Sequence, residues 1–218
     1  MNEQDLITPA SLCREIAETL ALPAGQVRTH WQQETVQPGT RVAADARQFG
    51  VTPHVYDEAM ERLYREGQGF VFETLCYWVR AERQAWSRRA LQRLAQHAQR
   101  RGCAPGQLRV LMLGDGSGSD TLLLACHGYR PTYVDVPGSV TAHFAASRFA
   151  RHGVEVRREH DLRALPSGGF DVVWSFDVLE HLPDLPAAVR AIGNWVGNHG
   201  LALITDACLQ VRPDLPTH

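Results

Sequence analysis

The spacing of apolar residues along the chain changes near residue 104. Up to that point apolar residues recur at helical intervals, as behind Thr8-Pro9, which reads as an N-cap followed by proline at the first helical position. Further helices are expected at three places: 24–35, 52–65 and 70–101. The turn at 37–40 and the glycines at 67 and 69 separate them. The pattern predicts an all-helical N-terminal region.

From residue 105 onward, short apolar runs alternate with segments of helical spacing. Strands are expected at five places: 108–113, 131–135, 153–157, 170–176 and 200–205. Helices are expected between them at 119–128, 138–152 and 183–196. Such alternation is typical of a doubly wound, mostly parallel α/β sheet. We therefore expect a helical region over 1–104, serving as a lid and substrate region, and an α/β domain over 105–218.

Glycine occupies every second position after the first predicted strand, at Gly114, Gly116 and Gly118. A strand, a glycine turn and a helix form the nucleotide-binding corner of an α/β sheet, where backbone N–H groups meet the ligand. A dinucleotide fingerprint would need its third glycine where Ser119 stands. The turn therefore favours an adenosine ligand that carries no pyrophosphate.

Acidic residues follow the next two predicted strands. Asp135 lies 21 residues after Gly114, where a carboxylate can accept hydrogen bonds from both ribose hydroxyls. Because Pro137 follows, Asp135 could instead cap a helix. Asp161 follows the third strand, where an acid could accept from an adenine amino group, or could be an ordinary loop aspartate.

Residues 108–206 resemble a class I S-adenosylmethionine-dependent methyltransferase. Three motifs carry the resemblance: V-L-x-L-G-x-G-x-G at 110–118, V-D at 134–135 and F-D-V-V-x-S-x-D-V-L-E-H-L at 170–182. It implies a Rossmann-like fold with S-adenosyl-L-methionine as the cofactor. In that family the glycine turn meets the methionine end of the cofactor, and an acid like Asp135 holds the ribose. The cofactor-binding residues implied here are Gly114, Asp115, Gly116, Gly118, Asp135, Val136, Asp161, Leu162, Phe176 and Asp177.

The chain departs from the family pattern in three ways. Met112 stands where the family usually has an acid that helps hold the cofactor's amino group, and Asp115 or Asp120 could substitute for it. The segment 136–138 is also less usual after the ribose acid. Finally, the pattern stops after the fifth strand, whereas the family's complete sheet has two more.

Methyl transfer needs a positioned acceptor and, for some acceptors, a base. His181, after the fourth predicted strand, is the first candidate base, because its neutral form is available near neutral pH. It could equally pack or cap a helix, and Glu180 has the same ambiguity. Asp177 and Asp206 could together hold a divalent metal, but two solvated carboxylates are the default, so no metal site is predicted.

The helical region is rich in aromatic residues, most of which are expected to pack in its core. The same region is expected to cover the cofactor crevice and exclude water. Such a lid suits a small acceptor methylated on oxygen, nitrogen or carbon. One alternative is an RNA or protein methyltransferase that uses the arginine-rich segment 80–101, although a solvated helix face explains those arginines more simply. Another is a scaffold or regulator that binds the cofactor without catalysis.

The composition and charge of the chain indicate which partners and which cellular compartment to expect. The 218 residues carry a formal net charge of −2, so no global field recruits nucleic acid or a membrane. The chain has no long apolar stretch and no signal-peptide pattern, and its five cysteines are dispersed, which together favour a cytoplasmic protein with reduced thiols. All its basic residues other than histidine are arginine, which excludes lysine chemistry and indicates a GC-rich, bacterial genome.

Overall fold

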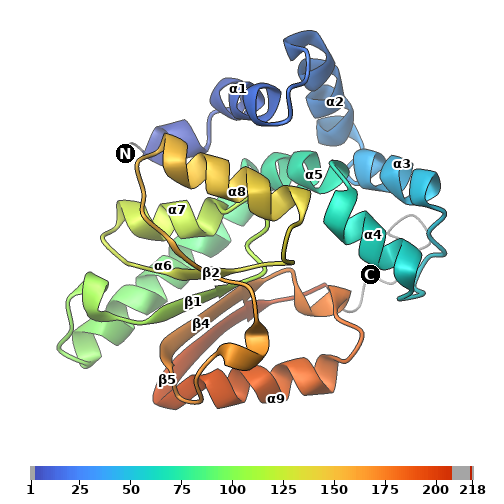
Figure 1. The fold of residues 1–218 in the computed structure, drawn as a ribbon. Coiled ribbons are helices and arrows are strands. Elements are labelled where there is room, and N and C mark those ends of the chain that lie inside the picture. The colour runs from blue at the N-terminus through green and yellow to red at the C-terminus, as the bar shows by residue number, and fades with distance from the viewer. Residues whose placement is uncertain (1–2, 208–216, 218) are drawn as a thin grey trace.

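A five-stranded sheet forms the centre of the computed structural model, which describes residues 3–207 and 217 (Figure 1). The strands are β1 (Val110–Leu113), β2 (Thr132–Val134), β3 (Arg157–Glu159), β4 (Phe170–Phe176) and β5 (Val196–Thr205). They pair in the order β3-β2-β1-β4-β5, and every pair is parallel. The strand order reverses between β1 and β4, which is where α/β folds bind ligands. The predicted doubly wound parallel sheet is confirmed.

Helices cover both faces of the sheet and bury β1 completely. The four helices of this layer arrangement are α6 (Ala81–Arg100), α7 (Ser119–Cys126), α8 (Val140–Arg151) and α9 (Leu185–Trp195). Val110 and Met112 pack into a cluster with α6 and α7, while Leu111 and Leu113 pack into another with α9. Alternate side chains thus enter opposite layers, which explains why the strand is a continuous apolar run in the sequence.

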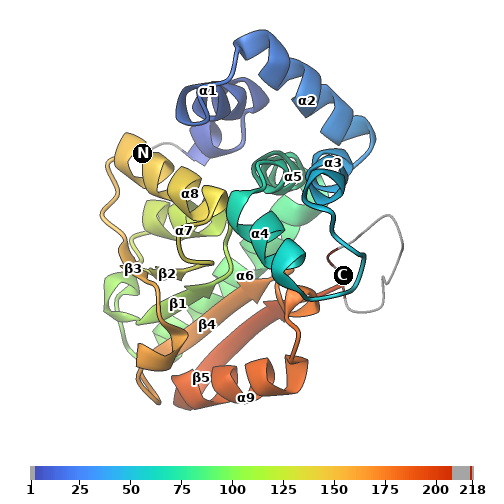
Figure 2. The same cartoon turned by 45° about the vertical axis from the view of Figure 1, so that its right-hand side comes forward.

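A third layer of helices lies over α7 and α8. It consists of α1 (Pro9–Thr19), α2 (Ala24–Val36), α3 (Thr40–Phe49), α4 (Glu58–Glu66) and α5 (Gly69–Trp78). Leu123 of α7 and Phe144 of α8 share one hydrophobic cluster with residues of α1, α2 and α5. Figure 2 shows α4 and α5 beyond the carboxyl end of β4. The helical region therefore packs on the α/β layers and reaches the edge where a ligand would bind. The boundary predicted near residue 104 stays a prediction.

The helical region differs from the prediction in three places. Thr52-Pro53 does not start a helix; α4 begins at Glu58, because Asp57 accepts a hydrogen bond from the Met60 N–H at 3.1 Å and caps it. The helix predicted over 70–101 is two helices, because Arg80 between them is extended. The structure also contains α3, Thr40–Phe49, where the sequence indicated only a turn followed by unassigned chain.

The outer strands differ from the prediction in position. Most of the segment predicted as the third strand is instead the turn that follows α8, where the Val154 N–H donates to the Phe149 carbonyl at 2.9 Å, and β3 forms only at 157–159. Strand β5 begins at Val196, directly after α9, with an irregularity opposite Phe170–Val172. The sheet of the described residues ends at β5, without the two further strands of the family's complete sheet.

No helix within the described ranges is both long and apolar enough to cross a bilayer. Four short 3₁₀ segments complete the described structure: Glu3–Leu6, Pro105–Gln107, Leu162–Ala164 and Leu179–His181. Four cysteines, Cys13, Cys76, Cys103 and Cys126, are free thiols, as predicted, whereas Cys208 lies outside the described residues.

Candidate functional site

The glycine loop between β1 and α7 has all three glycines at positive φ, +72° at Gly114, +48° at Gly116 and +73° at Gly118. A Cβ on Gly114 would lie 2.5 Å from a methyl group of Val178, and one on Gly118 would lie 2.6 Å from the Phe149 ring. On Gly116 the nearest atom would be the Thr74 methyl group, at 3.5 Å. The outer glycines are thus required for packing, whereas a Cβ on Gly116 would only come into ordinary van der Waals contact with α5, and Gly116 lines the cavities described below.

Asp135 lies at the end of β2 and is tied to that loop. One carboxylate oxygen accepts from the Gly116 N–H at 2.6 Å, and the other accepts from the Val136 N–H at 2.8 Å. Burial raises the pKa of Asp135 above its ordinary value. The helix-cap alternative does not apply, because Ser139 caps α8 by accepting from the Ala142 N–H at 3.0 Å. Each carboxylate oxygen has a second lone pair, so Asp135 can still accept from ribose hydroxyls.

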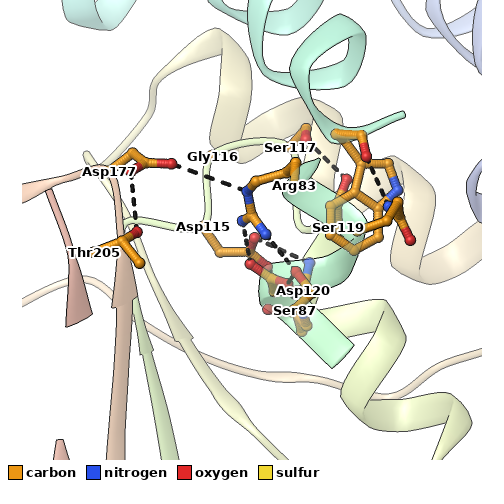
Figure 3. Close-up of polar contacts among 12 residues, drawn as sticks. Arg83, Ser87, Asp115, Gly116, Ser117, Ser119, Asp120, Asp177 and Thr205 are labelled. Atoms are coloured by element: carbon orange, nitrogen blue, oxygen red, sulfur yellow. Dashed lines mark hydrogen bonds and ion pairs between the residues drawn. The ribbon is translucent and has the colours of Figure 1, made fainter. Parts of the chain in front are cut away.

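A buried arginine joins α6 to the other side of the loop (Figure 3). Arg83 is only 7 % exposed; it donates to Asp120 Oδ2 at 2.5 Å and to the Ser87 hydroxyl. Ser87 in turn donates to Asp120 Oδ1 at 2.8 Å. The Nε atom of Arg83 lies 4.0 Å from Asp177 Oδ2. Asp177, just past β4, has φ +56° and accepts from the Thr205 hydroxyl at 3.0 Å. We call Arg83, Ser87, Asp120 and Asp177 the Arg83 network.

Asp115 adds a further carboxyl group beside this network. It accepts from the backbone N–H groups of Asp120 at 3.1 Å and Thr121 at 2.7 Å, and so caps the start of α7. Burial, and then the charge of Asp120, raise the pKa of Asp115 to about 7. Asp115, Asp120 and Asp177 thus gather around Arg83, while Arg148, whose charge also reaches Asp115, is paired with Glu15, so this part of the site favours an added cation.

Two cavities meet along the glycine loop. The smaller, about 90 Å³, is lined by residues of the loop, α6 and β4, among them Arg83, Met112, Asp115, Phe176 and Asp177. The larger, about 520 Å³, runs from the ends of β2 and β3 to α4 and α5. Its walls include Gly114, Gly116, Asp135, Val136, Asp161, Leu162, Asp177 and His181. The structure thus brings nine of the ten predicted cofactor-binding residues to these two cavities.

Gly118 is the exception, since it lines neither cavity. It turns the chain into α7 and packs against Phe149, so its role is to shape the loop. Asp161 combines its position on the cavity wall with a local role: it caps the segment Leu162–Ala164 by accepting from the Arg163 N–H at 2.9 Å. Whether these residues bind a cofactor stays a prediction.

His181 lies on the larger cavity, next to α4. Its ring centroid is 6.1 Å from that of Tyr64. Its Nδ1 is 2.9 Å from the carbonyl oxygen of Thr217, and a carbonyl can only accept, so Nδ1 carries the hydrogen. In the neutral ring Nε2 is then the nitrogen that can take a proton. This geometry is compatible with a base and also with a packing role.

The role of Arg83 was not predicted from the sequence, where Arg83 is one of the arginines of segment 80–101 that a solvated helix face would explain. The available signal is spacing: Arg83 and Ser87 lie on the same helical face as Ala90 and Leu94, all of which are buried. A polar pair on a buried face requires partners, and Asp120 and Asp177 provide them. The larger cavity likewise includes Glu73 of α5, which the sequence did not single out.

Within the part of the chain that the structure describes, no three histidine, cysteine, aspartate or glutamate side chains gather in a group that could hold a metal ion. Asp177, one of the two residues considered for a metal, accepts from Thr205 and faces Arg83.

Comparison with known proteins agrees with this geometry. A family model described as a methyltransferase domain matches residues 60–215. A probable S-adenosylmethionine-dependent methyltransferase of Mycobacterium tuberculosis is 31 % identical over 130 residues, which cover 59 % of this chain and 42 % of that protein. Two solved structures are also similar. The DszA carbon methyltransferase has a TM-score of 0.55 at 14 % sequence identity, and the match covers 88 % of this chain and 54 % of that protein. YcgJ of Bacillus subtilis has a TM-score of 0.44 at 25 % sequence identity, and the match covers 52 % of this chain and 49 % of YcgJ.

The family match spans most of the chain and includes α4 to β5. The chain belongs to the methyltransferase-domain family, and its fold is that of the class I S-adenosylmethionine-dependent methyltransferases. The match to the mycobacterial protein spans less than half of that protein's length.

Proposed function

We propose that this chain binds S-adenosyl-L-methionine along the glycine loop and transfers its methyl group to a small-molecule acceptor. The observation that carries the proposal is the larger cavity, which joins the predicted cofactor residues to an aromatic wall contributed by α4 and α5. The family match supports the reaction class, and the cavity volume of about 520 Å³ supports a small acceptor.

The residues present fit the cofactor. It carries two ribose hydroxyls, for which Asp135 has lone pairs left, and Gly116 leaves room for close approach of the backbone. It also carries a sulfonium and an ammonium. The carboxyl groups of Asp115, Asp120 and Asp177 lie around Arg83, and Arg148 at the same loop is paired with Glu15, so the carboxyl groups can favour these cationic groups although Met112 replaces the usual acid. When bound, the cofactor supplies the electrophilic methyl group.

The chain's own residues orient the acceptor and keep water out. Tyr56, Tyr64 and Phe70 line the cavity on the side of α4 and α5, opposite the glycine loop. Holding the reactants in line is worth about 7–11 kcal/mol in well-oriented systems. His181, on the same wall, has the ring nitrogen needed to accept a proton from an acidic acceptor.

Two other functions are separable by experiment. RNA binding would use the exposed arginines of α6, and Arg83 is not one of them because it is buried. A small-molecule acceptor is better supported, because the larger cavity borders the glycine loop and the exposed arginines of α6 do not line it. A non-catalytic scaffold would bind the cofactor in the same place but turn nothing over.

The test begins with calorimetric titration of S-adenosylhomocysteine, followed by a screen for its release from S-adenosylmethionine over a panel of metabolites. Turnover of a small molecule supports the proposal. Binding without turnover on any class of acceptor indicates the scaffold, and salt-sensitive RNA binding with RNA-dependent turnover indicates the other alternative. No binding of either nucleoside would contradict the proposal.

A further inference from the structure

Helix α5 carries one acidic residue, Glu73, in an otherwise almost wholly apolar sequence. Seven of its ten residues are buried, and it packs into the cluster that it shares with α1, α2, α7 and α8. Glu73 is half-buried and lines the larger cavity, beside Thr74, whose methyl group lies over the glycine loop. An acid in such a helix costs free energy unless something compensates its charge.

The described part of the chain provides no such compensation. No hydrogen bond and no ion pair joins Glu73 to another described residue, and the charge that reaches it is that of Glu34 on α2. Burial and Glu34 together raise the pKa of Glu73 to about 7. The other cavity acids differ: Asp135 accepts from two backbone N–H groups, and Asp177 faces Arg83 and Thr205.

Three aromatic rings stand on the same cavity wall. Tyr64 lies between the others, with its ring centroid 6.2 Å from that of Tyr56 and 5.1 Å from that of Phe70, both in stacked geometry. Burial raises the pKa of Tyr64 far above its ordinary range, and the charge of Glu73, which lines the same cavity, adds to the shift. Tyr64 therefore stays uncharged and adds no charge to this wall of the cavity.

We propose that Glu73, with the stacked rings of Tyr56, Tyr64 and Phe70, recognises a basic nitrogen on the methyl acceptor. A protonated nitrogen compensates the half-buried carboxylate, which a neutral hydroxyl does not, and aromatic faces attract cations. A carboxylate next to aromatic rings is thus complementary to a small amine with an apolar body. This inference rests on the proposed function, because it assigns the acceptor end of the same cavity.

The experiment compares matched probes on protein saturated with S-adenosylhomocysteine. The probes are 2-phenylethylamine and tryptamine, each paired with its alcohol, 2-phenylethanol or tryptophol, titrated by calorimetry at about pH 8, where Glu73 is ionised and the amines are protonated. Glu73→Gln keeps the shape and removes the charge. Glu58→Gln, an exposed glutamate on α4, is the matched control.

In the wild type and in Glu58→Gln, at least one amine should bind about tenfold or more tightly than its alcohol. Glu73→Gln should abolish that preference and leave the affinity for S-adenosylhomocysteine unchanged. The inference is overturned if no amine is preferred, if the preference survives in Glu73→Gln, or if that variant instead loses S-adenosylhomocysteine, which would place Glu73 on the cofactor. Failure of the proposed function is distinct: the wild type would not bind S-adenosylhomocysteine at all.

Discussion

At the scale of single residues, the site is shaped by carboxyl groups that are buried without full compensation. Asp115, Asp135 and Asp177 each have a raised pKa, and in each case burial is the main cause. A fold held together only for stability would gain little from such groups. They are explained if a ligand that donates hydrogen bonds or carries positive charge completes the site.

The raised pKa of Asp115 makes a prediction about stability and pH. Its folded pKa is about 7 against 3.8 as the ordinary value, so between these values the folded state binds more protons than the unfolded state. The free energy of unfolding should therefore fall as the pH rises from about 4 to 7. Asp115→Asn should flatten this part of the profile in urea titrations, and Asp184→Asn, at the exposed cap of α9, should not. An identical slope in wild type and Asp115→Asn would contradict the assignment.

His181 gives a second residue-level prediction. If it is the base, His181→Ala should lower turnover by about 10²–10⁴-fold on an acceptor that must lose a proton, with the affinity for S-adenosylhomocysteine nearly unchanged. Steady-state kinetics on the acceptor found in the screen provide the measurement. A turnover rate within about threefold of wild type would assign His181 to packing against Tyr64 instead.

At the scale of elements, the sequence predicts what depends on local pattern and misses what depends on distant partners. The apolar run of β1, the glycine loop and the acid at the end of β2 were located correctly, because a buried parallel strand and a tight turn leave local signals. The start of α4 was misplaced, because Thr52-Pro53 and Asp57 offer competing caps and only the fold selects Asp57.

The same distinction applies to the site. Residues that contact the cavity through strand ends were predictable from order along the chain. Arg83 and Glu73 were not, because their significance comes from helices α5 and α6 folding back over the loop. A solvated arginine and a buried one look alike in a sequence until the partner, here Asp120, is brought beside it.

Helix α6 is expected to depend on that arginine. Arg83→Met keeps the length of the side chain but leaves Asp120 and Asp177 without their cation, in a site where Arg83 is 7 % and Asp120 is 2 % exposed. Removing one partner of a buried ion pair typically costs about 3–5 kcal/mol. Chemical denaturation should show a loss of that order, whereas Arg93→Met on the exposed face should stay within about 0.5 kcal/mol of wild type. Equal stability of the two variants would show that the Arg83 network does not stabilise the fold.

At the scale of the whole molecule, the three layers converge on one edge of the sheet. The strand order reverses there, the glycine loop opens there, and α4 and α5 of the outer layer cover it (Figure 2). Helix α5 shares a core with α7 and α8, and α4 packs in a second cluster with α3 and Phe70 of α5, so the cover is built into the fold. This arrangement places a cavity for the acceptor beside the predicted cofactor residues.

The most direct test is calorimetric titration of S-adenosylhomocysteine into the wild type and Gly116→Val. A side chain at Gly116, where φ is +48° and the backbone faces the cavity, should abolish binding while circular dichroism shows an intact fold. We expect saturable binding of S-adenosylhomocysteine by the wild type and none by Gly116→Val. Equal affinity of both proteins for S-adenosylhomocysteine would contradict the proposal that the cofactor binds along the glycine loop.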